Sequence, residues 1–484
     1  MGINLLYNSQ KEKEKMMQEK LRIGFVPAHR EPFSEEWAID MRRRTLKVLK
    51  SVSKENNMEI IVPEESLTPK GLMRDDSDAE KVIELFKTKD LAGILIGTMT
   101  FGDEISAVTI AEKIPDLPVL LFGTKEGAFT EDGNRRSDSF CGTLSVASGL
   151  YRRGIPFAFL AICFPEEDIF NQGIKNFVRT CAAVKGFMGA KIGQVGPRPA
   201  PFETCAINEF PMIEQFAQRI VPISLADIFH AAETFEEKEV SHIIEKIKER
   251  ANCEEIREES IGKAARLELA LKDFVKQKNL AGLAVQCWDA MQKIYGISSC
   301  LTMGRLTEQG IMTACEVDIH GTLAMLVQYL ASLKKTVPHF IDWTIQHQSK
   351  ENVFLAWHCG NAPQVLAAKN IPICLREHSI LGPTLGPEKS EGTAEFPLKP
   401  GTVTFTRIVE YDGQFKMLIT KGKVIPSEDK LRGSWSWVEV PDLDGLYRTL
   451  IEEGFTHHAS MIHGDIASSL IEFCRFTGIE PIVI

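Results

Sequence analysis

Short apolar segments alternate with helical segments of ten or more residues through the first part of this 484-residue chain. Strong β-formers at 21–26, 58–62, 92–96 and 119–122 predict strands, and helical patterns occur between them, for example at 35–54 and 76–87. Strands that are joined through helices of this length must run parallel, because a hairpin cannot connect them. The alternation therefore predicts an α/β domain with a parallel sheet.

A second series of the same kind begins at Pro156. The almost continuously apolar run 157–163 predicts a strand that is buried on both faces, and a helix is expected at 168–185. Further strands are expected at 191–195, 220–223 and 280–285, and the charged segment 236–276 predicts exposed helix. The two series share a layout without obvious sequence identity, which indicates two similar domains.

The pattern changes after residue 371, where Gly, Pro and Thr become frequent and helical periodicity weakens. Strands are expected at 403–409 and 415–420 around a Tyr-Asp-Gly-Gln turn, which is a hairpin signal. The predicted fold class is α/β, with two Rossmann/flavodoxin-like α/β domains followed by a C-terminal domain that has an antiparallel β-barrel-like module. The expected boundaries are a polar leader at 1–20 and domains at 21–155, 156–315 and 316–484.

Composition excludes several classes of protein. The net charge of −10 and the lack of a basic cluster argue against a nucleic-acid partner. The longest apolar runs have strand length, so no membrane span is expected, and the first twenty residues lack the apolar centre of a secretory signal. None of the eleven cysteines forms a CxxC pair, and most lie in apolar runs, which indicates buried thiols and a reducing, cytoplasmic location.

Candidate chemistry concentrates between residues 286 and 363, where acids and histidines follow short apolar runs. Glu316 and Asp318 would share one face if 313–319 is a strand, Asp342 follows a second apolar run, and His358 follows a third. Carboxylates and imidazole from separate strand ends suit a divalent cation with open coordination positions. Asp318 also precedes a predicted helix, so it is a candidate ligand, acid/base or N-cap.

These segments together resemble a known family. The succession CEVDIHGTLAML, FIDW, WHCGNAP and GFTHHASMIHGD, with IGFVPAHREPF, RSDSFCG and KIGQVGPRPAPFETCAINE nearer the start, is similar to the L-fucose/L-arabinose isomerase superfamily. The resemblance covers most of the chain and is strongest over 280–484. It implies a metal-dependent aldose–ketose isomerase that interconverts an open-chain sugar and its ketose through a cis-enediol.

The resemblance also implies a ligand set and catalytic groups. Glu316, Asp342 and His458 match the positions that hold the divalent cation, expected here to be Mn²⁺. Glu316 and Asp342 are the natural acid/base pair, and which of them serves C1 and which serves C2 stays open. His358 matches either a fourth ligand or a substrate contact, and His457 either a substrate contact or a backbone partner.

Further substrate contacts are implied at Gln286 and in the loop that contains Trp435 and Trp437, where an indole face would pack on the sugar. An ordinary edge tryptophan is the alternative. The run 193–199 resembles a nucleotide loop only superficially, because it lacks GxGxxG and GK[ST].

Arg30 matches an arginine that the family sends into a neighbouring subunit's site, which implies a homotrimer or homohexamer; a surface arginine is the alternative. In the family an aromatic residue from the loop that corresponds to 97–101 also reaches across to this site, and no tryptophan occurs in that loop of this chain.

Two further functions therefore stay open. One is an isomerase of a modified anionic sugar such as sulfoquinovose, whose anionic end Arg30 and the 97–101 loop would meet. The other is a sugar-binding protein that has lost catalysis.

Overall fold

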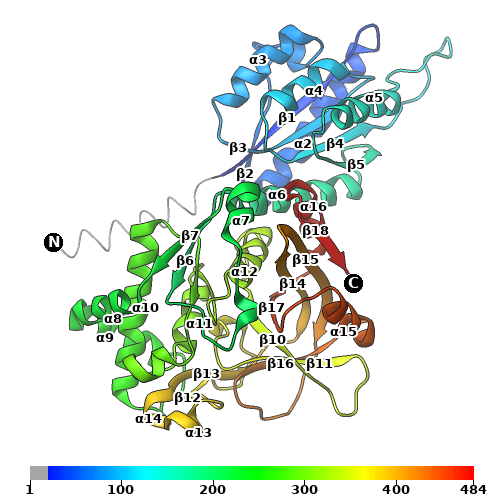
Figure 1. Cartoon of the computed structure of the whole chain (residues 1–484). Helices are drawn as coiled ribbons and strands as arrows, with labels where there is room; N and C mark the ends of the chain where they lie inside the picture. The colour runs from blue at the N-terminus through cyan, green and yellow to red at the C-terminus, as the bar shows by residue number, and fades with distance from the viewer. Residues whose placement is uncertain (1–19) are drawn as a thin grey trace. The chain divides into compact units, whose positions relative to one another are not determined.

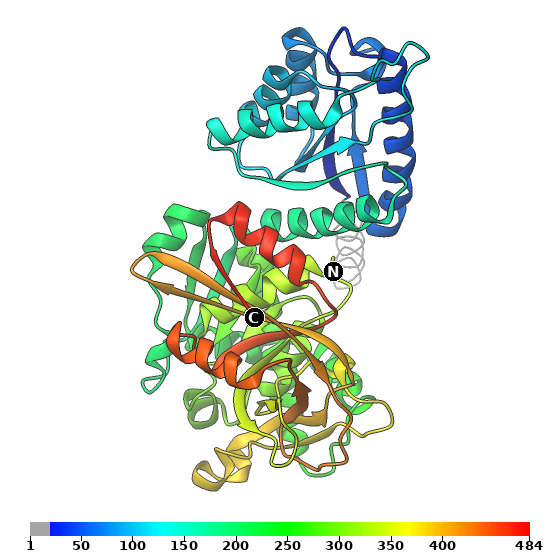
Figure 2. The ribbon, with the colours of Figure 1, turned by 90° about the vertical axis from the view of Figure 1, so that its right-hand side faces the viewer.

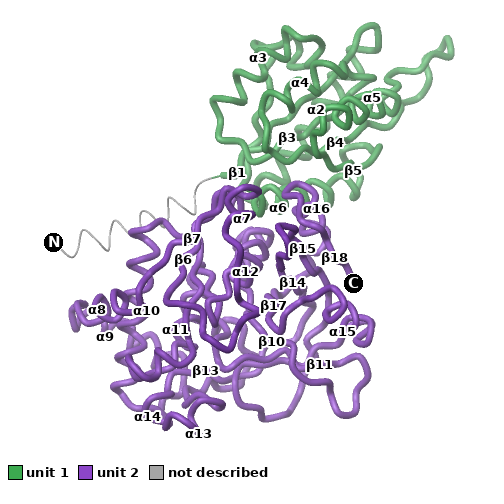
Figure 3. The backbone as a smooth tube through the Cα atoms, viewed as in Figure 1, with its two compact units in different colours: residues 1–185 green, residues 186–484 purple. Residues whose placement is uncertain are grey.

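The computed structural model describes residues 20–484, which form two compact units that divide between Lys185 and Gly186 (Figure 3). The leader expected at 1–20 lies outside the described residues except for Lys20. No helix in the described part of the chain has the length and apolar character that a membrane crossing requires.

The first unit is built on a five-stranded parallel sheet in the order β2-β1-β3-β4-β5 (Figure 1). The strands are β1 (Leu21–Ala28), β2 (Met58–Ile61), β3 (Leu91–Thr98), β4 (Val119–Thr124) and β5 (Phe157–Cys163), and the helices are α2 (Glu35–Asn56), α3 (Asp76–Lys87), α4 (Glu104–Lys113) and α5 (Ser139–Arg152). This is the flavodoxin-like strand order. Every residue of β3 is buried, as expected for a central parallel strand.

One expectation about this sheet was wrong. The strand at 157–163 was expected to open a second series, but β5 pairs with β4 and forms an edge of the first sheet. Its edge position explains why only Ala158 and Cys163 in it are buried. An apolar run alone does not distinguish an edge strand that begins a new domain from one that completes the previous domain.

The second unit contains a smaller parallel sheet in the order β7-β6-β8-β9. Its strands are β6 (Lys191–Val195), β7 (Arg219–Ile223), β8 (Gly282–Val285) and β9 (Met312–Ala314), and the helices of this region are α7 (Glu209–Phe216), α8 (Leu225–Thr234), α9 (Glu237–Lys248), α10 (Glu258–Lys278), α11 (Cys300–Glu308) and α12 (Ile319–Ala331), with α6 (Asp168–Phe187) crossing the division between the units. The order repeats that of β2-β1-β3-β4, which confirms the shared layout of two α/β segments.

The rest of the second unit is a nine-stranded mixed sheet. Its strands are β10 (His339–Gln346), β11 (Val353–His358), β12 (Cys374–Glu377), β13 (Glu391–Pro397), β14 (Gly401–Tyr411), β15 (Gln414–Val424), β16 (Ser434–Glu439), β17 (His458–His463) and β18 (Glu480–Val483), and its helices are α13 (Gly382–Leu385), α14 (Pro387–Ser390), α15 (Leu443–Glu452) and α16 (Ala467–Thr477). Short single turns complete the chain at Pro69–Gly71, Glu203–Cys205, Met291–Tyr295 and Gln364–Leu366. Because β15 pairs with β16 as well as with β14, the antiparallel pairings β16–β11–β10–β17–β14–β15 return to β16.

The expected hairpin at 403–420 is confirmed. The long β14–β15 hairpin, orange in Figure 2, turns at Asp412 and Gly413, whose φ angles of 53° and 80° are the left-handed values that a two-residue hairpin turn needs. Its register pairs Tyr411 with Gln414.

Helix α12 is fastened to this sheet by one buried glutamine. Gln328 Nε2 donates to the carbonyls of Thr404 on β14 (2.9 Å) and Ser460 on β17 (3.2 Å), and its Oε1 accepts from the Ser460 hydroxyl (2.7 Å). All polar atoms of the Gln328 amide group are thereby engaged in the core. The anchor fixes the C-terminal half of α12 against β14 and β17.

Candidate metal and substrate site

Three segments of the second unit bring their acidic and imidazole side chains to one place. Asp342 on β10 and His458, the first residue of β17, are direct partners in the antiparallel register. Glu316 follows β9 in the loop before α12. His458 Nε2 lies 3.4 Å from Glu316 Oε2 and 3.5 Å from Asp342 Oδ1. The structure thus brings together the three residues that the family resemblance pointed to.

The loop that presents Glu316 has an uncommon backbone. Strand β9 ends at Ala314, so the strand expected over 313–319 was wrong in its length, and Glu316 and Val317 take left-handed φ angles of 55° and 59°. Such values are costly for side chains with a Cβ, above all for a β-branched valine. The loop is held by hydrogen bonds from Val317 N to Val285 O (3.2 Å) and from Asp318 N to Cys315 O (3.0 Å).

Four buried atoms of this cluster lack a hydrogen-bond partner among the described residues. They are Glu316 Oε2, Asp342 Oδ1, His358 Nε2 and His458 Nε2. Potential ligand atoms of Asp342, His358 and His458 lie within 4.8 Å of one another, and so do those of Glu316, His457 and His458. Buried polar atoms are rarely left unpaired without a reason, and two carboxylates with an imidazole are a donor set that suits a divalent transition metal.

The ionisation of the cluster reflects its burial and its mixed charge. Burial raises the pKa of Asp342 to about 6. Burial opposes a charged His458, but its hydrogen bond to Asp318, the Cys205 thiol and the nearby Glu316 carboxylate outweigh this and raise its pKa well above the ordinary value. Burial lowers the pKa of His358 far below its usual range, so this imidazole is neutral. Its Nδ1 accepts from Cys359 N (2.8 Å), which places the ring proton on Nε2. The acidic cluster therefore favours a positive charge at its centre.

Asp318 and Arg407 support His458 from behind. Asp318 Oδ2 accepts from His458 Nδ1 (2.8 Å) and forms an ion pair with Arg407, and both Asp318 and Arg407 are almost fully buried. The hydrogen bond places a proton on Nδ1 and leaves Nε2 facing Glu316 and Asp342. A carboxylate that orients a histidine in this way is the usual support of a metal-ligating imidazole.

Asp318 is also the N-cap of α12, because its Oδ1 accepts from Gly321 N at 2.7 Å. The N-cap among the alternatives for this residue is confirmed, and its second oxygen adds the support of His458. Arg407 was missed by the sequence analysis. It stands 89 positions away on β14, in a strand-like run without a motif, and only the pairing of β14 with β17 explains its place.

Two of the expected substrate contacts, Gln286 and His457, lie at the edge of this cluster. Gln286 directly follows β8, and its Oε1 is buried without a partner among the described residues. The exposed His457 has its Nε2 3.7 Å from Glu316 Oε2, and its ring stacks on Phe202 at 6.2 Å. Phe202 in turn contacts Trp288 edge-on at 5.5 Å. Aromatic rings and unpaired polar atoms thus border the cluster.

Trp437 lies in a different setting. It is buried on β16, donates from Nε1 to Asp429 Oδ2 (2.7 Å), and with Trp435 lines a separate cavity of about 420 Å³. The ligand groups of the cluster do not line that cavity.

Arg30 belongs to the first unit, where it lies over the ring of Phe101 (4.7 Å) and near the carboxylates of Asp103 (3.6 Å) and Glu104 (3.5 Å). It therefore contacts the 97–101 loop with which it was expected to act.

Comparisons with known proteins cover most of the chain. Residues 24–188 match the family model "Fucose/sulfoquinovose isomerase, N-terminal domain", and residues 356–484 match "L-fucose isomerase, C-terminal domain". A sulfoquinovose isomerase of Priestia aryabhattai is 26% identical over 94% of this chain and 97% of its own length. A sulfoquinovose isomerase of Alkalicoccus urumqiensis is 25% identical over 96% and 99%, and an L-arabinose isomerase of Thermotoga maritima is 22% identical over 66% and 64%.

The family models match both the start and the end of the chain, in the order in which the motifs predicted them, and the second matched segment contains His358, His457 and His458. The chain therefore belongs to the L-fucose/L-arabinose isomerase superfamily, a superfamily of aldose–ketose isomerases.

Proposed function

We propose that this protein isomerises sulfoquinovose, a sugar with a sulfonate at C6, to the corresponding ketose. The main support for isomerase activity is the convergence of Glu316, Asp342 and His458 at one buried site, where each has an unpaired potential ligand atom. The near full-length likeness to sulfoquinovose isomerases favours the anionic sugar over a neutral aldose. The alternative of a modified anionic sugar is thus better supported than the main interpretation, an isomerase of an unmodified aldose.

The residues at the cluster fit a divalent cation, for which we propose Mn²⁺. Glu316, Asp342 and His458 would hold it, and the neutral His358, whose Nε2 carries the ring proton, would donate to a substrate oxygen instead. A cation at this position supplies Lewis-acid polarisation of the sugar's carbonyl oxygen. The fit rests on the unpaired buried atoms of these three ligands and on the support that Asp318 and Arg407 give to His458.

The two carboxylates account for the proton transfers of an aldose–ketose interconversion. One of Glu316 and Asp342 removes the proton from C2 of the open-chain sugar, and a carboxylate returns a proton to C1 through a cis-enediol. Gln286 and His457 orient the sugar's hydroxyl groups. The ring of Phe202 lies 5.5 Å from that of Trp288 and 6.2 Å from that of His457, measured between centroids. Phe202 and Trp288 therefore restrict water at the edge of the cluster. The convergence of Glu316, Asp342 and His458 speaks against a sugar-binding protein that has lost catalysis.

We further propose the assembly and location that the sequence predicted. Arg30 of a neighbouring subunit completes the site in a homotrimer or homohexamer, and the ring of six paired strands is the barrel-like module. The eleven cysteines, all within the described residues, form no disulfide, and most of them are buried, which supports a reducing, cytoplasmic compartment.

The test compares sugars and metal. Purified protein is stripped of metal, supplied with Mn²⁺ or with none, and incubated separately with sulfoquinovose, D-glucose, L-fucose and L-arabinose. Ketose formation is followed by NMR. The proposal predicts turnover with Mn²⁺ and a higher kcat/KM for sulfoquinovose than for each neutral sugar. Turnover of a neutral sugar alone would contradict the substrate, and full turnover after complete metal removal would contradict the cofactor.

A further inference from the structure

The segment from Gly196 to Cys205 lies along the substrate side of the cluster. A Cβ placed on Gly196, whose φ is 80°, would stand 2.5 Å from Gln286 Oε1, so the backbone here runs directly beside that side chain. Further along, Phe202 contacts Trp288 and His457, and Cys205 Sγ lies 4.0 Å from His458 Nδ1. The segment is thus anchored to the site at both ends.

Arg198 lies between these two anchors. It is half-buried, and its side chain has one hydrogen bond among the described residues, a 3.4 Å contact from Nη1 to the neighbouring Pro199 carbonyl. Within the described part of the chain no carboxylate comes within ion-pair distance of its guanidinium, and most of its donors are therefore free for a ligand.

The backbone around Arg198 is already ordered. Pro197 and Pro199 flank it, and a residue before proline is restricted to extended conformations. Phe202 N donates to Pro199 O (3.1 Å), and Cys205 N donates to Phe202 O (3.0 Å), so the segment holds itself in place. The backbone therefore needs no ordering when this guanidinium binds a ligand, and only the side chain loses conformational freedom.

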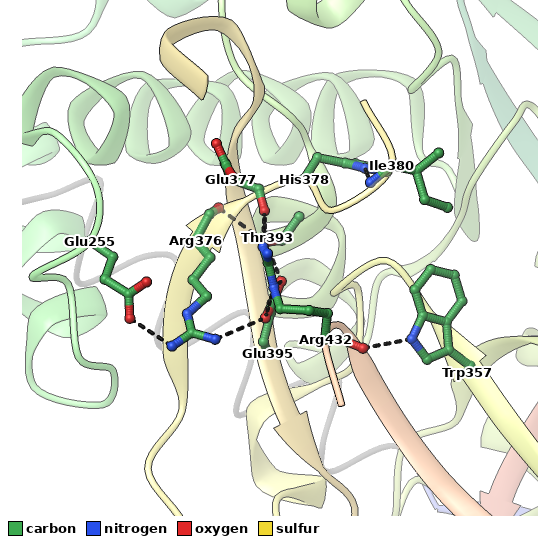
Figure 4. A network of polar contacts seen from close by, with 9 residues as sticks. All are labelled: Glu255, Trp357, Arg376, Glu377, His378, Ile380, Thr393, Glu395 and Arg432. Carbon is green, nitrogen blue, oxygen red and sulfur yellow. Dashed lines mark hydrogen bonds and ion pairs between the residues drawn. The ribbon is translucent and has the colours of Figure 1, made fainter. Parts of the chain in front are cut away.

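Three other arginines of the second unit, Arg376, Arg407 and Arg432, are already paired with carboxylates. Figure 4 shows that Arg376 is shared between Glu255 and Glu395, while Arg432 binds Glu395 and the carbonyl of Glu377. Arg407 is committed to Asp318, as described above. In the first unit, Arg30 already lies near two carboxylates.

We infer that Arg198 binds the sulfonate of the substrate and so selects the anionic sugar. The inference rests on the proposed function and assigns its specificity to a named side chain. A sulfonate carries a full negative charge and presents several acceptor oxygens, which the planar guanidinium fork can bind in pairs. Arg198 meets the far end of a sugar whose C1 and C2 lie at Glu316 and Asp342.

The test measures turnover and binding in the variants Arg198→Gln and Arg198→Lys. For Arg198→Gln we expect KM for sulfoquinovose to rise about 10- to 100-fold, as for loss of a hydrogen bond to a charged group, with kcat nearly unchanged. Kinetics with D-glucose, which has a hydroxyl in place of the sulfonate, should not change. The lysine variant should recover only part of the loss, because it keeps the charge without the fork.

Arg219→Gln is the matched control. Arg219 is exposed at the start of β7, whereas the segment 196–205 follows the opposite end of the paired strand β6. It should leave both sugars unaffected. An equal rise of KM for both sugars in Arg198→Gln would indicate a structural role and overturn the inference, as would an unchanged KM. A loss of sulfoquinovose selectivity in Arg30→Gln but not in Arg198→Gln would assign the sulfonate to Arg30.

Calorimetry with sulfoquinovose separates this inference from the proposed function. Wild-type protein that binds sulfoquinovose but does not isomerise it, and that loses this binding in Arg198→Gln, would contradict the function and support the inference. If the wild-type protein isomerises sulfoquinovose and the Arg198→Gln variant binds it with unchanged affinity, the function is supported and the inference is contradicted.

Discussion

Replacement of Asp318 by asparagine tests how the protein fixes His458. Both oxygens of Asp318 accept hydrogen bonds, Oδ1 from Gly321 N and Oδ2 from Arg407 and His458 Nδ1. Asparagine keeps one acceptor oxygen and turns an NH₂ group toward at least one of these donors. The substitution also removes the counter-charge of a guanidinium that is 1% exposed.

The expected cost has two parts. Breaking a buried ion pair while one partner stays in place costs about 3–5 kcal/mol of stability. Loss of the hydrogen bond that orients a ligating histidine lowers metal affinity by about 10- to 100-fold. Urea-induced unfolding of the metal-free protein measures the first part, and calorimetric titration with Mn²⁺ measures the second.

Asp442→Asn is the control for capping. Asp442 caps α15 through the same contact, with Gly445 N 2.9 Å from its Oδ1, but it is exposed and has no buried arginine. Asparagine caps helices about as well as aspartate, so this variant should keep its stability and its Mn²⁺ affinity.

The double variant Asp318→Asn/Arg407→Met separates the two parts. It removes the unpaired guanidinium and should recover much of the lost stability, while Mn²⁺ affinity should stay low because His458 still lacks its acceptor. If Asp318→Asn behaves like Asp442→Asn, or if the double variant restores both properties, the assignment of Asp318 and Arg407 as the support of His458 is refuted.

Three further predictions concern the site and the assembly. Glu316→Gln should lower kcat for ketose formation by about 10²-fold or more at saturating Mn²⁺, and near-normal turnover would show that another group is the base. Chelation should abolish turnover, and Mn²⁺ at about 100 times its Kd should raise the free energy of unfolding by about 2.7 kcal/mol, an increase that His458→Ala should remove. Sedimentation should find a homo-oligomer with a three-fold axis, and a fully active monomer would contradict the shared site.

Much of the fold could be predicted from hydrophobic patterning. The strands at Leu91–Thr98 and Lys191–Val195 and the helix Asp168–Phe187 occur close to where the sequence placed them, because buried parallel strands are apolar runs and amphipathic helices repeat every three to four residues. The sheet that β5 joins was not predictable, because strand pairing depends on tertiary contacts that an apolar run does not specify.

The site could be predicted only in part. The convergence of Glu316, Asp342 and His458 was expected because their segments match the family's metal-binding positions in order, and the apolar runs alone did not single out these three residues. The left-handed backbone at Glu316 gave no signal, because no glycine or asparagine marks it. Arg407 could not be found, because its role depends on the pairing of β14 with β17.

Isomerisation of sulfoquinovose in D₂O tests the central claim most directly. The Mn²⁺-loaded protein is taken to equilibrium with the sugar, and NMR reports deuterium at C2 of the aldose and at C1 of the ketose. If carboxylates at the Glu316/Asp342/His458 cluster transfer a proton through an enediol, deuterium from the solvent accumulates at both carbons over repeated turnovers. Equilibrium reached without any deuterium would indicate hydride transfer and contradict the account, and the absence of a ketose product would contradict the activity itself.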